Sequence, residues 1–300
     1  MRLDRIAIGM DFSPTAIATA EWVATSLAPD ASITLVHAIE PPARPPFLVA
    51  NTLPAAVLET DARALAEQRL REIAQTIGRG DMGMEVRVGR AHEVIERVAM
   101  DTDADLIAVG PHGNREHESL LLGTTADSLA RAAATPVLVG ARASMHGRTR
   151  VVAALVESHV KAHVLSWADL AARALGGRLT ALHVLEPAVY SHIASLAAAH
   201  AHGDASVEQT EIEEEMRRET VHWLRTCASS GVDVSRVEPL VEHGQAAEAI
   251  LAYAAREKAA LIVLGRHRAV PGAPALLGRT VRHVLHEARC AVLLVPVREA

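Results

Sequence analysis

Short apolar runs alternate with longer amphipathic stretches along the first half of the chain. Apolar runs bounded by Gly, Pro or polar residues predict strands at residues 5–10, 32–39, 84–88, 106–109 and 136–139. Amphipathic periodicity and helix-forming composition predict helices at residues 14–27, 55–77, 91–100 and 126–134. Strands that alternate with helices are typical of parallel crossover units, so we expect a doubly wound α/β domain with a mainly parallel sheet of five strands.

The same pattern starts again after a linker at residues 141–150. Thr-Leu-Val-His-Ala-Ile-Glu-Pro at 34–41 returns as Thr-Ala-Leu-His-Val-Leu-Glu-Pro at 180–187, an offset of 146 residues. Gly-Arg-Ala-His-Glu-Val-Ile at 89–95 returns as Gly-Gln-Ala-Ala-Glu-Ala-Ile at 244–250, an offset of 155. The sequence therefore predicts two copies of one α/β domain, at residues 1–143 and 148–300.

The two offsets differ by nine residues, which we expect as an insertion around residues 192–226. The offset of 146 also matches the first strand of the first half with residues 152–156. It thereby places Glu157 opposite Asp11.

Composition narrows the class of protein. Half of the residues are hydrophobic but only 2% are aromatic, which predicts aliphatic cores of the kind that parallel sheets use. A net charge of −6 without a basic stripe argues against a nucleic-acid partner. The chain has only two cysteines, and the strand that is expected to start near Ile6 leaves no room for a signal peptide. It also has no apolar run long enough to cross a bilayer. We therefore expect a cytoplasmic protein with no membrane partner.

Candidate chemistry is concentrated between residues 105 and 140. A predicted strand ends in Gly110, a polar loop carries Gly113, and Gly123-Thr124-Thr125 opens a predicted helix. Glycines let backbone N–H groups approach a bulky anion, and a helix N-terminus adds unpaired donors and a favourable dipole. This stretch favours a phosphate ligand.

The spacing Gly110-x2-Gly113-x9-Gly123-Thr124 resembles the ATP-binding signature of the universal stress protein family, and the two halves together extend the resemblance over nearly the whole chain. The resemblance implies an adenine nucleotide alpha-hydrolase-like fold in each half, with ATP at the carboxyl ends of the strands. It implies contacts of Asp11 with the adenosine part of the nucleotide, and of the backbone at Ala38 with adenine. The residues implied to wrap the ribose and phosphates are Gly110, Gly113, Gly123, Thr124 and Thr125.

Structural roles remain open for several of these residues. Asp11 could cap the following helix, and Thr124 or Thr125 could be a simple N-cap. The sixteen histidines show no metal-ligand spacing, so we expect them to be surface or locally hydrogen-bonded residues, with His37 and His183 in equivalent structural positions.

The second half departs from the nucleotide signature. Arg268 stands where the middle glycine is expected, and Arg279 follows Gly278 where the signature has a hydroxyl. We expect a degenerate loop that has lost ATP binding.

No catalytic motif accompanies the predicted site, so we expect no catalytic residue and no metal ligand in the protein. The sequence favours an ATP-binding stress-response regulator, with or without Mg²⁺, in which ATP orders residues 111–122. A protein-interaction module that binds no nucleotide and a slow ATP hydrolase are the alternatives. The resemblance also implies an internal pseudo-dimer in which residues 136–139 pair with 292–296, and it leaves a homodimer open.

Overall fold

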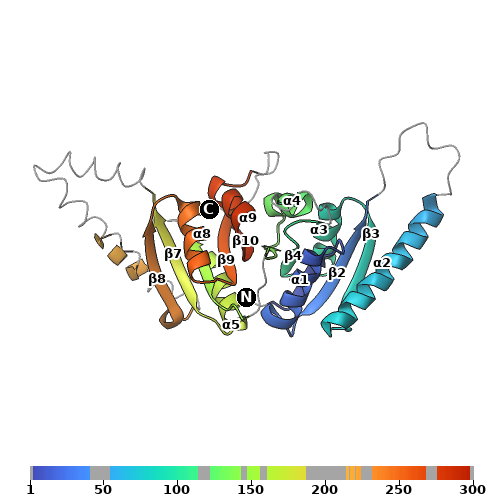
Figure 1. Ribbon diagram of the computed structural model, residues 1–300, viewed down its shortest axis with the longest axis horizontal. Helices are drawn as coiled ribbons and strands as arrows, with labels where there is room; N and C mark the ends of the chain where they lie inside the picture. Colours follow the sequence, from blue (N-terminus) through green and yellow to red (C-terminus); the bar gives the residue numbers. More distant parts are fainter. Residues whose placement is uncertain are drawn as a thin grey trace, which may run out of the picture. The chain divides into compact units, whose positions relative to one another are not determined.

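The computed structural model describes residues 3–40, 55–113, 122–142, 147–155, 161–186, 214–215, 217–219, 221–223, 232–267 and 276–297. The chain separates into two compact units, with the division after Arg142. Each unit is an α/β domain built on a parallel sheet (Figure 1). Most of the expected insertion, the loop residues 114–121, Glu157 and Arg268 lie outside the described residues.

The first unit contains five strands connected by helices. In chain order its elements are β1 (Arg5–Gly9), α1 (Pro14–Trp22), η1 (Val23–Leu27), β2 (Ser32–Ile39), α2 (Ala55–Ile77), β3 (Gly83–Val88), α3 (Ala91–Asp101), β4 (Leu106–Val109), α4 (Thr124–Ala132) and β5 (Val137–Val139). The strand order β3-β2-β1-β4-β5 is parallel throughout. The chain winds outward from β1 through β2 to β3 and then returns to β4, which places the connecting helices on both faces of the sheet. This confirms the doubly wound fold.

The local sequence explains where these elements begin and which faces they bury. All four residues of β4 are buried, as expected of a central parallel strand covered on both sides. Helix α1 begins at Pro14, and the Ser13 hydroxyl accepts a hydrogen bond from the Ala16 amide at 3.2 Å. Helix α3 buries Val94, Ile95, Val98 and Ala99 at helical spacing.

Several boundaries differ from the sequence-based expectation by one or more residues, and three of them have a clear structural basis or bear on the site. The helix expected at 14–27 changes at Val23 into a π-helical turn, which closes with the Ala28 amide donating to the Val23 carbonyl at 2.8 Å. Strand β5 excludes Pro136, which has no amide hydrogen but accepts a bond from the Ile107 amide through its carbonyl. Helix α4 begins at Thr124, two residues before the expected start.

The second unit repeats this arrangement. Its described elements are β6 (Val151–Leu155), α5 (Lys161–Ala174), β7 (Leu179–Leu185), the 3₁₀ turn η4 (Val234–Arg236), β8 (Val237–His243), α8 (Ala246–Arg256), β9 (Leu261–His267), α9 (Arg279–Glu287) and β10 (Ala291–Val297). Within this unit the order β10-β9-β6-β7-β8 is also parallel. The duplication predicted from the sequence is therefore present in the fold.

The register corrects one part of the predicted repeat. Ile6 pairs with Leu106 in the first unit, and Val151 pairs with Leu261 in the second. Since 106 and 261 are 155 apart, Ile6 is equivalent to Val151, and the first strands are offset by 145 residues rather than 146. Asp11 then aligns with Val156 of the sequence, so the expected match of Asp11 with Glu157 is wrong. The strands alone could not reveal this slip, because short apolar runs align almost equally well one residue apart.

Gly140 follows β5 where the chain passes helix α1. A Cβ on Gly140 would lie 1.8 Å from Oγ1 and 2.9 Å from Cβ of Thr19, whose side chain is buried. We expect Gly140→Ala to lower the free energy of unfolding by about 1–3 kcal/mol, because α1 must move to make room. Urea unfolding of the full chain measures the change.

Gly80→Ala is the matched control for this substitution. Gly80 has no atom within 4 Å of a Cβ built on it, so its substitution should leave stability within about 0.5 kcal/mol of the parent. Equal midpoints for the two variants would contradict the packing argument.

Candidate functional site

The carboxyl ends of β1, β2 and β4 surround one cleft in the first unit. Asp11 follows β1, Ala38 lies near the end of β2, and Gly110 follows β4. The cleft has a volume of about 500 Å³ and is also lined by the start of α4. The structure brings all seven predicted site residues to this cleft: Asp11, Ala38, Gly110, Gly113, Gly123, Thr124 and Thr125.

Asp11 is held in place by its own turn and stands close to Gly113. Its Oδ1 accepts a hydrogen bond from the Ser13 amide at 2.9 Å, while Ser13 rather than Asp11 caps α1. A Cβ on Gly113 would lie 2.8 Å from Asp11 Oδ2. A side chain at 113 would therefore collide with this carboxylate, which the glycine leaves open to the cleft.

The ends of the glycine-bearing loop are fixed by hydrogen bonds. Thr15 Oγ1 donates to the His112 carbonyl at 2.9 Å, and the Gly123 amide donates to the Pro111 carbonyl at 2.8 Å. Gly110 passes so close to α1 that a Cβ would lie 3.0 Å from the Ala16 nitrogen. These contacts hold both ends of the loop against the rim of the cleft.

Helix α4 points its N-terminus into the cleft. Gly123 is the N-cap residue, and no side chain among the described residues accepts a hydrogen bond at this cap. Thr124 and Thr125 are therefore not the N-cap, and both line the cleft. The unpaired amides and the dipole of the first turn form a favourable position for an anion.

The remaining wall of the cleft is apolar. Val36, Ile95 and Val109 are buried residues that line it from β2, α3 and β4. A cleft that combines an apolar wall with a carboxylate and a helix N-terminus suits a ligand with a flat ring at one end and an anion at the other.

His112 lines the cleft as well, although the sequence predicts a surface or locally hydrogen-bonded histidine. Its Nδ1 is buried and has no hydrogen-bond partner in the described part of the chain. Burial lowers the pKa of His112, and the charge of Arg142 lowers it further, while Asp11 opposes the shift. The position of His112 between two signature glycines was the available sequence signal.

His37 also lines the cleft, and the structure supports its predicted structural role. Its Nδ1 lies 2.7 Å from the Met10 carbonyl oxygen, and His183 Nδ1 lies 3.0 Å from the Leu155 carbonyl oxygen in the second unit. The two histidines make the same strand-to-strand contact in both halves. A shared position in a half with and a half without the signature indicates a contribution to the fold.

The second unit differs at the equivalent strand end. Strand β4 ends at Val109, but β9 continues through Gly265 to His267, and these added residues pair with β10. Arg266 is 2% exposed in this extension. The chain therefore stays within the sheet where the first unit leaves it to form the loop.

Two further properties concern only the described part of the chain. It contains no group of three or more His, Cys, Asp or Glu residues placed to bind a metal ion. None of its helices is both long and apolar enough to span a membrane. Cys290 is buried, and burial raises the pKa of its thiol to about 11, in agreement with an inert residue.

Comparison with known proteins gives one family for both halves. The sequence profile of the Universal stress protein family matches residues 2–140 and again residues 147–296. A universal stress protein from Archaeoglobus fulgidus aligns over 99% of both chains at 19% identity, with a TM-score of 0.67. A protein of unknown function from Pseudomonas aeruginosa PAO1 aligns over 98% of this chain and 92% of its own at 17% identity, with a TM-score of 0.63.

Other comparisons add less. A universal stress protein solved in complex with cAMP aligns over 47% of this chain and 98% of its own at 21% identity, and its TM-score of 0.35 is too low to transfer a ligand. A search of curated proteins found no match.

The lowered pKa of His112 predicts a pH dependence of stability. Folding lowers this pKa from the ordinary value of 6.5, so the unfolded chain binds the proton more tightly. Neutral His112 makes its full contribution to the free energy of unfolding above the pKa that it has in the unfolded chain. This contribution is lost as the pH falls from there through the lower pKa of the folded protein. Between about pH 7.5 and 5.5 we expect the free energy of unfolding to fall less steeply in His112→Gln than in the parent.

Urea midpoints measured across this pH range test the expectation. His283→Gln on the exposed face of α9 is the matched histidine control. An unchanged pH slope in His112→Gln would show that its protonation is not linked to folding.

Proposed function

Because the chain belongs to the universal stress protein family, we propose that it is an ATP-binding stress-response regulator in which the first unit holds the nucleotide. The observation that supports this most directly is the convergence of all seven predicted site residues on one cleft of suitable volume. The composition, with two cysteines and no basic stripe, favours action in the cytoplasm without a nucleic-acid or membrane partner.

The groups around the cleft suit the parts of ATP. The free oxygen of Asp11 can accept hydrogen bonds from ribose hydroxyls, and the backbone near Ala38 lies where adenine would reach β2. The apolar wall suits the base, and the first turn of α4 suits the phosphates. We propose that Mg²⁺ enters with those phosphates when it is present.

We further propose that the second unit does not bind ATP. The continuation of β9 through Arg266 differs from the first unit, where the loop begins at the equivalent place, and at the offset of 145 residues the sequence has a valine in the position of Asp11. Arg279 replaces the first threonine after the helix cap. The second unit would then act as a packing or regulatory partner, and the state of the nucleotide in the first unit would be the signal.

We expect one ATP per chain in a calorimetric titration of nucleotide-stripped protein. Gly113→Arg should weaken ATP binding by at least about tenfold, because the new side chain meets Asp11 at the cleft. Gly80→Arg, an equal change at an open surface glycine of the same unit, should stay within about twofold of the parent.

Each other stoichiometry has a definite meaning. Two sites would show that the second unit retains binding despite Arg266 and Arg279. A titration that detects no ATP-binding site would reject the ATP hypothesis in favour of an interaction module. Release of inorganic phosphate that Gly113→Arg abolishes would identify a slow hydrolase.

We also propose that the two units pair as an internal pseudo-dimer through β5 and β10. Each of these strands stands at one end of the strand order of its own unit and is rich in Val and Leu. An apolar edge strand needs a partner to avoid aggregation.

The pairing predicts that residues 1–143 alone self-associate, since they would carry β5 without β10. Analytical ultracentrifugation over a range of concentrations measures this. Replacing Leu138 with Lys should weaken the association, while Leu65→Lys on the exposed face of α2 should not. A fragment that stays folded and monomeric at high concentration would overturn the pairing.

A further inference from the structure

A second cleft lies at the opposite, amino edge of the sheet in the second unit. It has a volume of about 610 Å³ and lies where β6 and β7 begin and α8 ends. The charged residues that line it are Arg148, Arg150, Arg178, Lys258 and Glu257. Four cations and one carboxylate form an unusually basic site for a chain with a net charge of −6.

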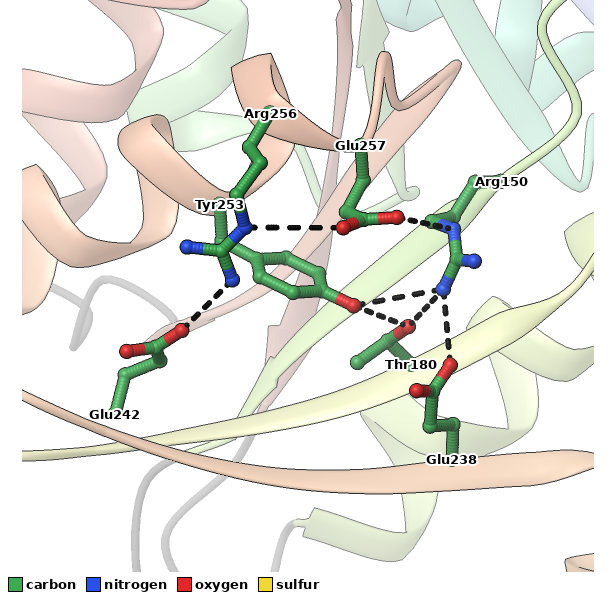
Figure 2. Close-up of polar contacts among 7 residues, drawn as sticks. All are labelled: Arg150, Thr180, Glu238, Glu242, Tyr253, Arg256 and Glu257. Carbon is green, nitrogen blue, oxygen red and sulfur yellow. Dashed lines mark hydrogen bonds and ion pairs between the residues drawn. The ribbon is translucent and has the colours of Figure 1, made fainter.

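Arg150 forms a rigid wall of this cleft. Its Nη1 donates to Glu238 at 2.9 Å and to Thr180 Oγ1 at 3.1 Å, and its Nε lies 3.4 Å from Glu257. Figure 2 shows the guanidinium fixed between the two carboxylates. The side chain is 18% exposed and pairs with two carboxylates, so its charge is largely balanced and its position well defined.

Glu257 is also balanced. Its carboxylate is shared between Arg150 and Arg256, and Arg256 Nε lies 3.7 Å away (Figure 2). Arg256 is itself held by Glu242 at 2.9 Å. The carboxylate of Glu257 is therefore committed to two arginines.

The other three cations at the cleft are uncommitted. Arg148, Arg178 and Lys258 make no ion pair and no side-chain hydrogen bond with the described residues. They are half-buried or exposed around the same opening. The cleft thus has an unbalanced positive charge that would attract an anion.

In the first unit, carboxylates of the protein occupy the equivalent edge and pair with the groups there. Asp105 Oδ2 accepts hydrogen bonds from the backbone amides of Asp4 and Arg5, both at 2.9 Å. Asp103 lies 3.2 Å from the Arg5 guanidinium. In this unit an anionic oxygen from the protein satisfies two adjacent N–H groups.

The second unit has the same backbone without these carboxylates. The Ala260 amide donates to the Arg150 carbonyl at 2.8 Å, just as the Asp105 amide donates to the Arg5 carbonyl at 2.8 Å, so Ala260 stands in place of Asp105. Lys258 stands in place of Asp103, with φ of 51° against 48°. The amides of Thr149 and Arg150 make no hydrogen bond within the described chain, and both residues line the cleft.

We propose that this cleft binds a small, multiply charged oxyanion of the phosphate class. One oxygen takes the place of the Asp105 carboxylate at the amides of Thr149 and Arg150. Arg148, Arg178 and Lys258 bind the other oxygens by charge-assisted hydrogen bonds. This site is independent of ATP binding at the carboxyl edge of the first unit.

The experiment is a calorimetric titration of the full chain with inorganic tripolyphosphate at constant ionic strength. Gly113→Arg is included as a second background, because tripolyphosphate could also enter the cleft of the first unit. We expect one site in both backgrounds. Lys258→Asp should weaken binding by at least about tenfold, since it restores the carboxylate of the first unit in a backbone conformation that aspartate tolerates.

Two further variants sharpen the test. Ala260→Asp restores the internal carboxylate and should also abolish binding; Lys258→Asp decides alone if the buried aspartate prevents folding. Arg282→Gln removes one exposed positive charge of the same unit outside the cleft and should bind within about twofold of the parent.

Several outcomes would overturn the proposal. They are no binding at about 1 mM tripolyphosphate, equal weakening in Lys258→Asp and Arg282→Gln, and loss of binding in Gly113→Arg alone. If the protein does not bind tripolyphosphate but self-associates, and Lys258→Asp weakens this self-association, the cleft instead binds carboxylates of a second copy.

Discussion

Parallel pairing of β1 with both β2 and β4 is the constraint from which the sites of the first unit follow. Because the three strands run in the same direction, their carboxyl ends lie together although Asp11, Ala38 and Gly110 are far apart in the sequence. The residues that follow the strands then face one cleft, and a helix N-terminus completes it. The chemistry of this edge is a consequence of strand direction before it is a consequence of any single side chain.

The same pairing leaves the amino ends of the strands at the opposite edge, where the backbone amides of Asp4 and Arg5 bond to a side chain instead of a neighbouring strand. The first unit satisfies two such amides with Asp105, and the second unit has Ala260 at that place. Backbone amides that are paired internally in one copy therefore have no partner among the described residues of the other. The two copies therefore share one fold but differ in the polar groups at both edges of the sheet.

Much of this was predictable from the sequence, since strand and helix periodicity depends on local patterning. Such patterns predict the helices and strands of the first half and the duplication of the domain. They also predict that the glycines of the signature lie in one loop. The one-residue slip between the first strands did not, because Ile6 and Val151 lie in apolar runs that tolerate either alignment. Only hydrogen-bond register resolves it, and with it the equivalence of Arg5 and Arg150.

Other features depended on contacts that no local pattern encodes. His112 became notable through the burial of its Nδ1 and the nearby charges of Arg142 and Asp11, which depend on the path of the loop between β4 and α4. The π-helical end of α1 likewise reflects packing, because the sequence of residues 23–27 is compatible with a regular helix. The amino-edge cleft required comparison of two folded copies, since Ala260 is unremarkable until Asp105 is seen to bind amides.

The two halves also differ in the polarity of a shared ion pair. Arg87 on β3 pairs with Asp101 at the end of α3 at 2.6 Å, and the equivalent residues of the second unit, Glu242 and Arg256, pair at 2.9 Å with the charges exchanged. If α3 docked on β8 during folding, Asp101 would meet Glu242, and α8 on β3 would bring two arginines together. Like charges at both mismatched contacts disfavour exchange of helices between the copies, which is a characteristic failure of tandem repeats. The reversal leaves each correct pair as favourable as the other, so it adds specificity between two similar domains without weakening either.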